Sequence, residues 1–316
     1  MAMNQVQFQR GLSMAEFLDK YGTEEKCHAA LAASRWPEGY RCPACRDERH
    51  STFMHEGRKY WQCHRCRTQT TVTAGTIFQA TKLPLSRWFL AMHLMTQAKN
   101  NVSALELKRH LGVRYKTAWL MKHKLLQVMA EREDRRVLDG RVEIDDAYLG
   151  GEKPGKPGRG SENKISFVAA VQTTESGKPI CIRLDRIVFT KEALEAWANK
   201  ALASSAQVIS DGLHCFKAVA GEVASHTAIV TGSGRQAATH PEFRRVNTVL
   251  SNLKTAISGT YHAFKFAKYA ERYLAEVQYR FNRRFDLSVI LVRLMRAAVL
   301  TRPRPEQMIR LAEVGG

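Results

Sequence analysis

The chain has 316 residues, of which 44% are hydrophobic and 25% charged, as in an ordinary folded protein, and this length predicts two or three domains. Lys and Arg total 49 against 30 Asp and Glu, a formal net charge of +19 that is spread along the chain and favours nucleic acid as the partner. No apolar run reaches about 18 residues, the length of a membrane span. The N-terminal residues do not resemble a signal peptide, so we expect a cytoplasmic protein.

The apolar pattern changes several times along the chain. Residues 13–33 have the spacing of an amphipathic helix with a break near Gly22, residues 36–75 show little helical period, and residues 83–130 return to helical spacing. Strand-like segments, a helix, a further strand and C-terminal helices follow, at residues 141–151, 164–172, 179–188, 190–202, 206–211 and 247–312. This order predicts a multidomain protein of the α+β or α/β class.

Four of the seven cysteines form two Cys-x-x-Cys pairs. Cys42 and Cys45 are separated from Cys63 and Cys66 by 17 residues. Two such pairs on facing turns can supply the four thiolates of a tetrahedral Zn²⁺ site, which leaves no open position and is therefore structural. An iron–sulfur site and a redox pair are the alternatives. The pattern predicts a zinc ribbon that the metal stabilises.

Residues 103–129 have the pattern of two helices joined by a turn at residues 111–113. Ser103 can cap the first helix, with Glu106 as its capping-box partner. In a helix-turn-helix the second helix enters the major groove with its early residues. The predicted DNA-binding side chains of this helix are Arg114, Tyr115, Lys116 and Lys122. The alternative is an ordinary helical hairpin with a solvated basic face.

Two aspartates lie where metal ligands are common. Asp145 is on or at the end of a predicted strand, and Asp211 ends a short apolar strand just before Gly212. In a regular strand the alternation places Glu143 and Asp145 on one face and Asp146 on the other. Either aspartate alone could cap a turn. Together, two carboxylates on adjacent strands can hold a pair of Mg²⁺ ions for phosphoryl transfer.

Several motifs resemble a known family. The segments IDDAYLGGEKPGKPGRG, ISDG, RRVNTVLSNLKTAISGTYH and YRFNRRFD look like those of the ISXO2-like insertion-sequence transposases, the IS1595 family. The CPAC and CHRC knuckles followed by a helix-turn-helix are similar as well, so the resemblance runs from about residue 20 to residue 300. It implies an RNase H-like fold for the catalytic domain, with an Asp-Asp-Glu type of triad and a downstream Lys.

Carried onto this sequence, the resemblance implies Asp145 and Asp211 as the first two catalytic residues. The third position departs from Glu: Asn247, 36 positions after Asp211, is read in its place, with Lys254 seven positions further on. Asn252 and Glu242 stay open as alternatives for the third ligand. An Asn carbonyl can ligate Mg²⁺ but brings no charge. Lys254 is expected at a DNA phosphate.

The expected domain organisation follows from these motifs. It comprises an N-terminal helical segment (1–35), a zinc ribbon (36–78), a helix-turn-helix domain (79–137), an RNase H-like catalytic domain (138–300) and a C-terminal tail (301–316). A basic Gly/Pro-rich loop between the first two catalytic strands carries further expected phosphate contacts, at Lys153, Lys156 and Arg159. We expect Arg283 and Arg284 to face DNA or to pair with an acid.

The sequence thus predicts a DNA transposase that binds the terminal inverted repeats of an insertion sequence. It would cleave and transfer strands with Mg²⁺ or Mn²⁺ at Asp145, Asp211 and Asn247, and act as a dimer or larger assembly on double-stranded DNA. We expect a bacterial protein that associates with the nucleoid when bound to DNA. The alternatives are a non-catalytic or decayed DNA-binding protein of transposase origin and a nuclease without strand transfer.

Overall fold

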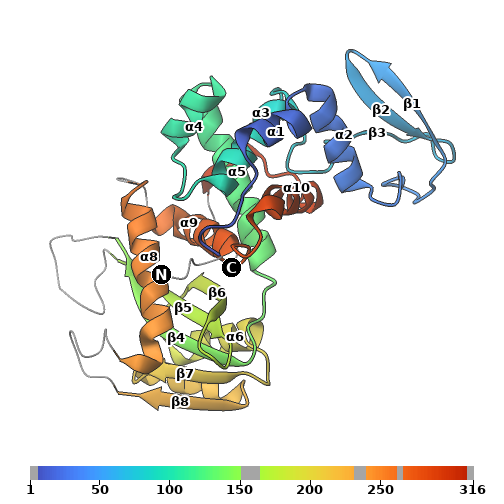
Figure 1. The fold of residues 1–316 in the computed structure, drawn as a ribbon. Helices are drawn as coiled ribbons and strands as arrows, with labels where there is room; N and C mark the ends of the chain where they lie inside the picture. The colour runs from blue at the N-terminus through green and yellow to red at the C-terminus, as the bar shows by residue number, and fades with distance from the viewer. Residues whose placement is uncertain (1–5, 151–163, 231–239, 262–265, 312–316) are drawn as a thin grey trace. The chain divides into compact units, whose positions relative to one another are not determined.

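The structure is a computed structural model that describes residues 6–150, 164–230, 240–261 and 266–311. The chain divides into two compact units, which are coloured by residue number in Figure 1. Unit 1 combines residues 1–128 with 285–311, and unit 2 comprises residues 129–284 together with the last residues of the chain. Within the described ranges, no helix is both long enough and apolar enough to cross a membrane.

Unit 1 begins with two capped helices and a small sheet. Ser13 and Glu16 form a capping box at the start of α1, and Thr23 caps α2, so the break predicted near Gly22 is confirmed. A three-stranded antiparallel sheet follows in the order β1-β2-β3. The bounds of these elements are α1 Met14–Tyr21, α2 Glu24–Arg35, β1 His50–His55, β2 Arg58–Cys63 and β3 Gln69–Thr71.

The remaining helices of unit 1 bury apolar side chains, and the last residues of α5 belong to unit 2. Helix α4 is capped by Ser103, which accepts a hydrogen bond from the N–H of Glu106 at 3.1 Å. It ends at Gly112, whose φ of +63° suits glycine best. Helix α10 packs on α2 and α3, although it is distant from them in sequence. The bounds are α3 Leu85–Gln97, α4 Ala104–Leu111, α5 Tyr115–Glu133, α10 Ile290–Leu300 and α11 Glu306–Leu311.

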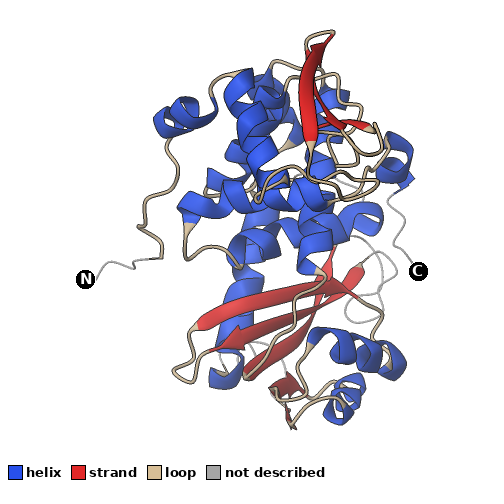
Figure 2. Ribbon diagram, turned by 90° about the vertical axis from the view of Figure 1, so that its right-hand side faces the viewer, coloured by secondary structure: helices blue, strands red, loops and turns tan. Residues whose placement is uncertain are grey.

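Unit 2 is built on a five-stranded mixed sheet, drawn in red in the lower part of Figure 2. Its strand order is β6-β5-β4-β7-β8. Strand β5 pairs antiparallel with both β4 and β6. Strand β7 pairs parallel with both β4 and β8. The bounds are β4 Arg141–Leu149, β5 Ile165–Thr173, β6 Pro179–Arg186, β7 Gln207–Asp211 and β8 Ser225–Ile229.

Helices cover this sheet on both faces. Val142 and Ile144 belong to an apolar core with α6 (Lys191–Ala201) and the 3₁₀ helix His214–Gly221. Because side chains alternate along a strand, Glu143 and Asp145 face the other side. There α8 (Arg244–Ser258) packs on β4 and β5, and α9 (Phe266–Phe281) packs on β6.

The edge strand β6 is covered by side chains from the end of α9. The N–H of Ile182 donates to Oδ1 of Asn282 at 2.7 Å, and the amide of Asn282 donates back to the carbonyl of Ile182 at 3.0 Å. The N–H of Leu184 donates to Oε1 of Gln278 at 3.0 Å. Backbone groups that would face an open sheet edge are therefore satisfied, which protects this edge against pairing with other chains.

Candidate functional site

Asp145 and Asp211 lie side by side on neighbouring parallel strands of unit 2. The pairing of β4 with β7 matches Glu143 with Ile209 and Ile144 with Ser210. Asp145 and Asp211 occupy the next position on each strand and therefore project to the same face. The structure thus brings together the two aspartates that the sequence selected.

A third carboxylate, Asp146, completes this acidic cluster. Ligand oxygens of Asp145, Asp146 and Asp211 all lie within 4.8 Å of one another. The register of β4 with β5 is unbroken through Asp146, so the predicted alternation holds and the Asp146 side chain leaves the strand on the face opposite to Asp145. The paired register of β4 and β7 ends at Ile144 and Ser210, so both aspartates of β4 lie beyond the last β7 contact. Sequence reasoning missed Asp146 as a candidate ligand, and its only signal was adjacency to Asp145.

The turn after Asp211 explains the Gly in the ISDG motif. Oδ1 of Asp211 accepts a hydrogen bond from the N–H of Leu213 at 3.2 Å, so the carboxylate also closes the turn. A Cβ atom at Gly212 would lie 2.8 Å from a methyl group of Val230, closer than such contacts occur. Glycine at this position therefore lets the end of β7 approach the residue that follows β8.

Asn247 and Lys254 lie on one side of α8. They are seven residues apart, about two turns, which places them on neighbouring lines along the helix. Asn247 is half-buried and lines a cavity of about 830 Å³ that Glu143 also lines, while Lys254 is exposed. The buried stripe of α8 is next to this side and consists of Val246, Val249, Leu250, Leu253 and Ile257.

Of the two alternatives for the third ligand, Glu242 lines the same cavity as Asn247, and Asn252 is not among the residues that line it. Asn252 is exposed, and the helical period turns it away from the buried stripe of α8. Glu242 precedes the helix, and its Oε2 accepts a hydrogen bond from Nη2 of Arg141 at 2.6 Å. Asn247 and Glu242 thus both lie close to β4, but Glu242 is already paired with Arg141.

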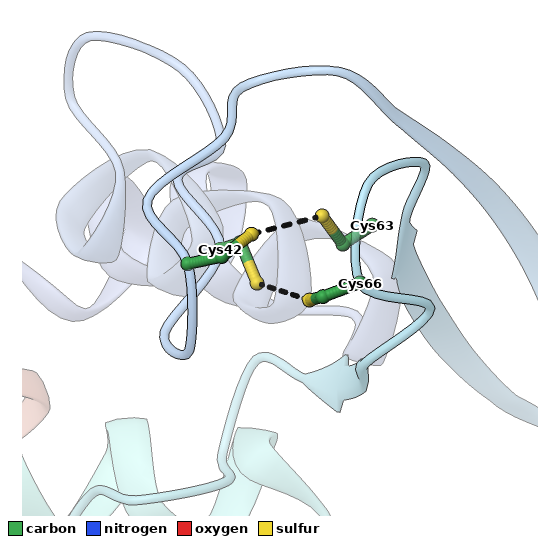
Figure 3. Close-up of side chains that lie close together, drawn as sticks. Cys42, Cys63 and Cys66 are labelled. Atoms are coloured by element: carbon green, nitrogen blue, oxygen red, sulfur yellow. Dashed lines mark hydrogen bonds between the residues drawn. The ribbon is translucent and has the colours of Figure 1, made fainter.

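The four predicted zinc ligands gather in unit 1. The sulfur atoms of Cys42 and Cys66 are 3.5 Å apart, as are those of Cys45 and Cys63, and all four lie within 4.8 Å of one another (Figure 3). A tetrahedral site with Zn–S bonds of about 2.3 Å needs sulfur atoms roughly 3.8 Å apart. The four thiols therefore fit one zinc ion.

The two cysteine turns have the same backbone geometry. The N–H of Arg46 donates to the carbonyl of Cys42 at 3.0 Å, and the N–H of Arg67 donates to that of Cys63 at 3.1 Å. Arg46 and Arg67 both have positive φ angles, +66° and +61°. This repeated left-handed residue turns the chain sharply behind each pair, so that both thiols of a pair point to the same centre.

The helix pair α4–α5 exposes three of its four predicted DNA-binding residues. Arg114, Tyr115 and Lys116 are exposed at the start of α5, and Nζ of Lys116 lies 3.2 Å from a carboxylate oxygen of Glu306. Lys122 is different, because its side chain is fully buried and its ammonium donates to the carbonyl of Val102. We therefore leave Lys122 out of the proposed DNA-binding surface.

Of the other candidate cations, the structure places two arginines and does not describe three residues of the basic loop. Arg283 is buried and pairs with Glu133, and Arg284 donates to the carbonyls of Pro179 and Ile180. Of the two roles expected for Arg283, facing DNA or pairing with an acid, the structure shows the second. The three loop cations lie outside the described residues: Lys153, Lys156 and Arg159.

Two segments of the chain match models of known protein families. Residues 137–282, which contain the acidic cluster, match the model of the ISXO2-like transposase domain. Residues 22–69, which contain the four cysteines, match the model of the transposase zinc-ribbon domain. Both models are named for the same IS1595 family, and together they cover more than half of the chain. Over these two segments the chain is similar to this family of transposases.

A protein from an archaeon shows similarity as well. It is described as an uncharacterized protein in transposable element ISH50 of Halobacterium salinarum. The two sequences are 28% identical over 211 residues, which cover 61% of this chain and 69% of the other. The description of this relative thus places it in a transposable element.

Proposed function

We propose that the protein is a DNA transposase that binds the terminal inverted repeats of its element and cleaves and transfers DNA strands with divalent metal ions. The observation that carries this proposal is the acidic cluster of Asp145, Asp146 and Asp211 within the family-matched domain. A protein that only binds DNA has no need for three carboxylates whose oxygens lie within 4.8 Å.

The donor set of the cluster fits Mg²⁺ or Mn²⁺. Carboxylate oxygens are the ligands that these hard cations prefer, and like charges this close are costly without a cation. Asp145, Asp146 and Asp211 would hold the metal. When bound, such ions polarise the phosphodiester and favour the deprotonated form of a water or 3′-hydroxyl nucleophile.

The chain's own residues would then position the DNA. The amide oxygen of Asn247 offers a neutral ligand or a contact to substrate, in the place where related triads carry a carboxylate. The exposed ammonium of Lys254 is suited to a phosphate oxygen beside the reacting bond. No Ser or Tyr nucleophile is assigned, so each step is a direct in-line displacement at phosphorus.

We further propose that unit 2 contains an RNase H-like domain. In support, three antiparallel strands followed by two parallel ones give the order β6-β5-β4-β7-β8, with carboxylates on the central strand and its parallel neighbour. Helices on both faces of a mixed sheet are compatible with this assignment.

We propose that unit 1 recognises DNA. The zinc ribbon and the α4–α5 helix-turn-helix would contact the element's ends, with Arg114, Tyr115 and Lys116 exposed at the start of the second helix. Phosphate contacts from Lys153, Lys156 and Arg159 and assembly as a dimer on DNA stay predictions from the sequence.

End cleavage tests the proposed function. A labelled duplex that carries the element's terminal repeat and flanking DNA is incubated with the protein and Mg²⁺ or Mn²⁺, beside a reaction with EDTA and a duplex with a scrambled repeat. We expect a nick at the repeat end that leaves a 3′-hydroxyl, only with metal and only on the cognate repeat. Specific binding without any metal-dependent nick would instead indicate a DNA-binding protein that has lost catalysis.

A further inference from the structure

A buried glutamate on the catalytic strand contacts the helix that carries Asn247. Glu143 is 1% exposed and precedes Asp145 by two residues on the same face of β4. Its Oε2 accepts hydrogen bonds from the backbone N–H groups of Arg245 at 3.0 Å and Val246 at 3.1 Å. Its Oε1 accepts one from Nη1 of Arg141 at 2.8 Å.

Helix α8 needs this carboxylate because it has no N-terminal cap of its own. The residue at its N-cap position is Phe243, which makes no side-chain cap hydrogen bond, and the first turn contains no acidic residue. The free N–H groups of a first turn carry partial positive charge and favour an anion. Glu143 supplies both the acceptor and the negative charge, from the strand and not from the helix.

A second connection joins the same two elements. Arg141, at the start of β4, donates to Glu143 and also, at 2.6 Å, to Glu242 in the 3₁₀ turn that leads into α8. Arg141 therefore pairs with two glutamates, Glu143 on the strand and Glu242 just before the helix, and so ties the start of α8 to the start of β4. Burial of an unpaired carboxylate would cost several kcal/mol, so these contacts are what makes Glu143 tolerable inside the protein.

These contacts fix the helix relative to the acidic cluster. Two residues along a strand span about 7 Å, so the hydrogen bonds of Glu143 lie roughly that far from the backbone of Asp145. Asn247 directly follows Val246, one of the two donors, and Lys254 lies two turns further along α8. Because α8 packs on β4, any slip of the helix along this strand would move Asn247 and Lys254 relative to the aspartates that the strand carries.

We propose that Glu143 is a positioning residue for strand cleavage, holding α8 in register with the aspartates so that Asn247 and Lys254 meet the reacting DNA. This inference rests on the proposed function. Glu143 itself would contact neither metal nor DNA, because its two carboxylate oxygens already accept three hydrogen bonds from the protein.

Amide exchange and a double-mutant cycle test this role. Glu143→Ala removes the acceptor, Glu143→Gln keeps one oxygen but loses the charge, and Glu175→Gln makes the same amide change at an exposed glutamate lining the same cavity. Each variant is checked for folding by circular dichroism and thermal unfolding. Hydrogen exchange is followed at the amides of residues 245 and 246, and end cleavage is measured with and without Asn247→Ala.

We expect Glu143→Ala to speed exchange at these two amides and to slow cleavage about 10- to 100-fold, as loss of a supporting contact does at metal sites. Glu143→Gln should lose less, and Glu175→Gln should match the wild type. In the Asn247→Ala background, Glu143→Gln should cost much less than it does alone, because both substitutions remove the same positioned group.

Two results would overturn the inference while leaving the proposed function intact. One is wild-type cleavage by a folded Glu143→Gln or Glu143→Ala variant whose amides have lost protection. The other is full additivity with Asn247→Ala, which would show that Glu143 does not act through the helix. If the wild-type protein cleaves no DNA, the proposed function fails and this inference fails with it.

Discussion

Each aspartate of the acidic cluster should be indispensable for catalysis but not for folding. Asp145→Asn or Asp211→Asn removes a charged metal ligand. Because a bound metal ion contributes several kcal/mol of transition-state stabilisation, its loss should lower the cleavage rate by more than about 100-fold. End cleavage should fall by at least that factor, while affinity for the terminal repeat and thermal stability stay near wild type. Asp139→Asn, the same change at an exposed turn before β4, serves as the control. Cleavage that survives in either cluster variant would rule out ligation by that residue.

At the scale of single residues, the sequence predicted which side chains could bind metal more reliably than it predicted which side chains are buried or lie close together. The Asp145–Asp211 pairing was predictable because both carboxylates lie on or at the end of predicted strands, although either one alone could have capped a turn. The approach of Asp146 was not, since it depends on where β4 parts from β7. Lys122 had the same spacing as surface cations of its helix, and only the fold shows that it is buried with its ammonium on the carbonyl of Val102.

Among the secondary-structure elements, the end of α5 is held to the end of α9 by a buried ionic group. Glu133 is 2% exposed and accepts hydrogen bonds from Arg283, from Nε of Arg136 at 3.0 Å and from Asn282 at 2.7 Å. Burial raises the pKa of Glu133, but the charges of Arg283 and Arg136 and these hydrogen bonds outweigh it and hold that pKa below the ordinary 4.5. A carboxyl whose pKa is lowered by folding stabilises the folded state above its unfolded pKa.

Replacing this carboxylate should lower stability in a pH-dependent way. Glu133→Gln leaves Arg283 buried without its counter-charge, so we expect the free energy of unfolding at pH 7 to fall by about 3–5 kcal/mol. The deficit should shrink as the pH drops below about 4.5 through the folded pKa, where the wild type loses the same charge. Urea unfolding at pH 7 and at lower pH measures this, with Glu195→Gln on the exposed side of α6 as control. An equal deficit at every pH would contradict the explanation.

The zinc ribbon should contain one zinc ion that its four cysteines hold. Metal analysis of the purified protein should give one zinc per chain, and Cys63→Ser should lose it because a tetrahedral site cannot replace a missing thiolate from within this cluster. Cys181→Ser, at a cysteine in unit 2 outside the cluster, should keep its zinc. Iron in place of zinc, or zinc retained by Cys63→Ser, would refute the assignment.

The exposed start of α5 should contribute to DNA affinity. Arg114→Ala should weaken binding to the terminal repeat by about 10-fold or more, because a direct phosphate or base contact of this kind is worth roughly 1–3 kcal/mol. Thermal stability should not change, since the side chain is exposed. Lys191→Ala removes one exposed cation from α6 and controls for net charge. Equal losses for both variants, measured by fluorescence anisotropy, would point to charge alone.

The helices and strands were largely predictable from the sequence, whereas the residues from elsewhere in the chain that cap or cover them were not. Caps at Ser13, Thr23 and Ser103 and the turn at Gly112 are local signals, and the structure uses each of them. The cap of α8 comes from Glu143, about 100 residues earlier in the chain, so the sequence around the helix does not reveal it. The side chains that cover the edge of β6 are likewise distant in sequence and become evident only in the fold.

At the scale of the whole molecule, composition and motifs together indicated both DNA binding and catalysis. The net charge of +19, the four-cysteine cluster and the acidic cluster are separate features of one chain, and two models of a single transposase family match the segments that carry the two clusters. The association of α10 with α2 and α3 joins the two ends of the chain in unit 1, and no local pattern predicts it.

The most direct test of the central claim is strand transfer in vitro. A pre-cleaved duplex ending in the element's terminal repeat is mixed with a plasmid target, the purified protein and Mg²⁺ or Mn²⁺, beside Asp145→Ala and Asp211→Ala. Joined products from the wild type that vanish in both variants are the predicted result. Joining that persists in both variants, or metal-dependent cleavage that never yields a joined product, would contradict the assignment of a transposase that works through these aspartates.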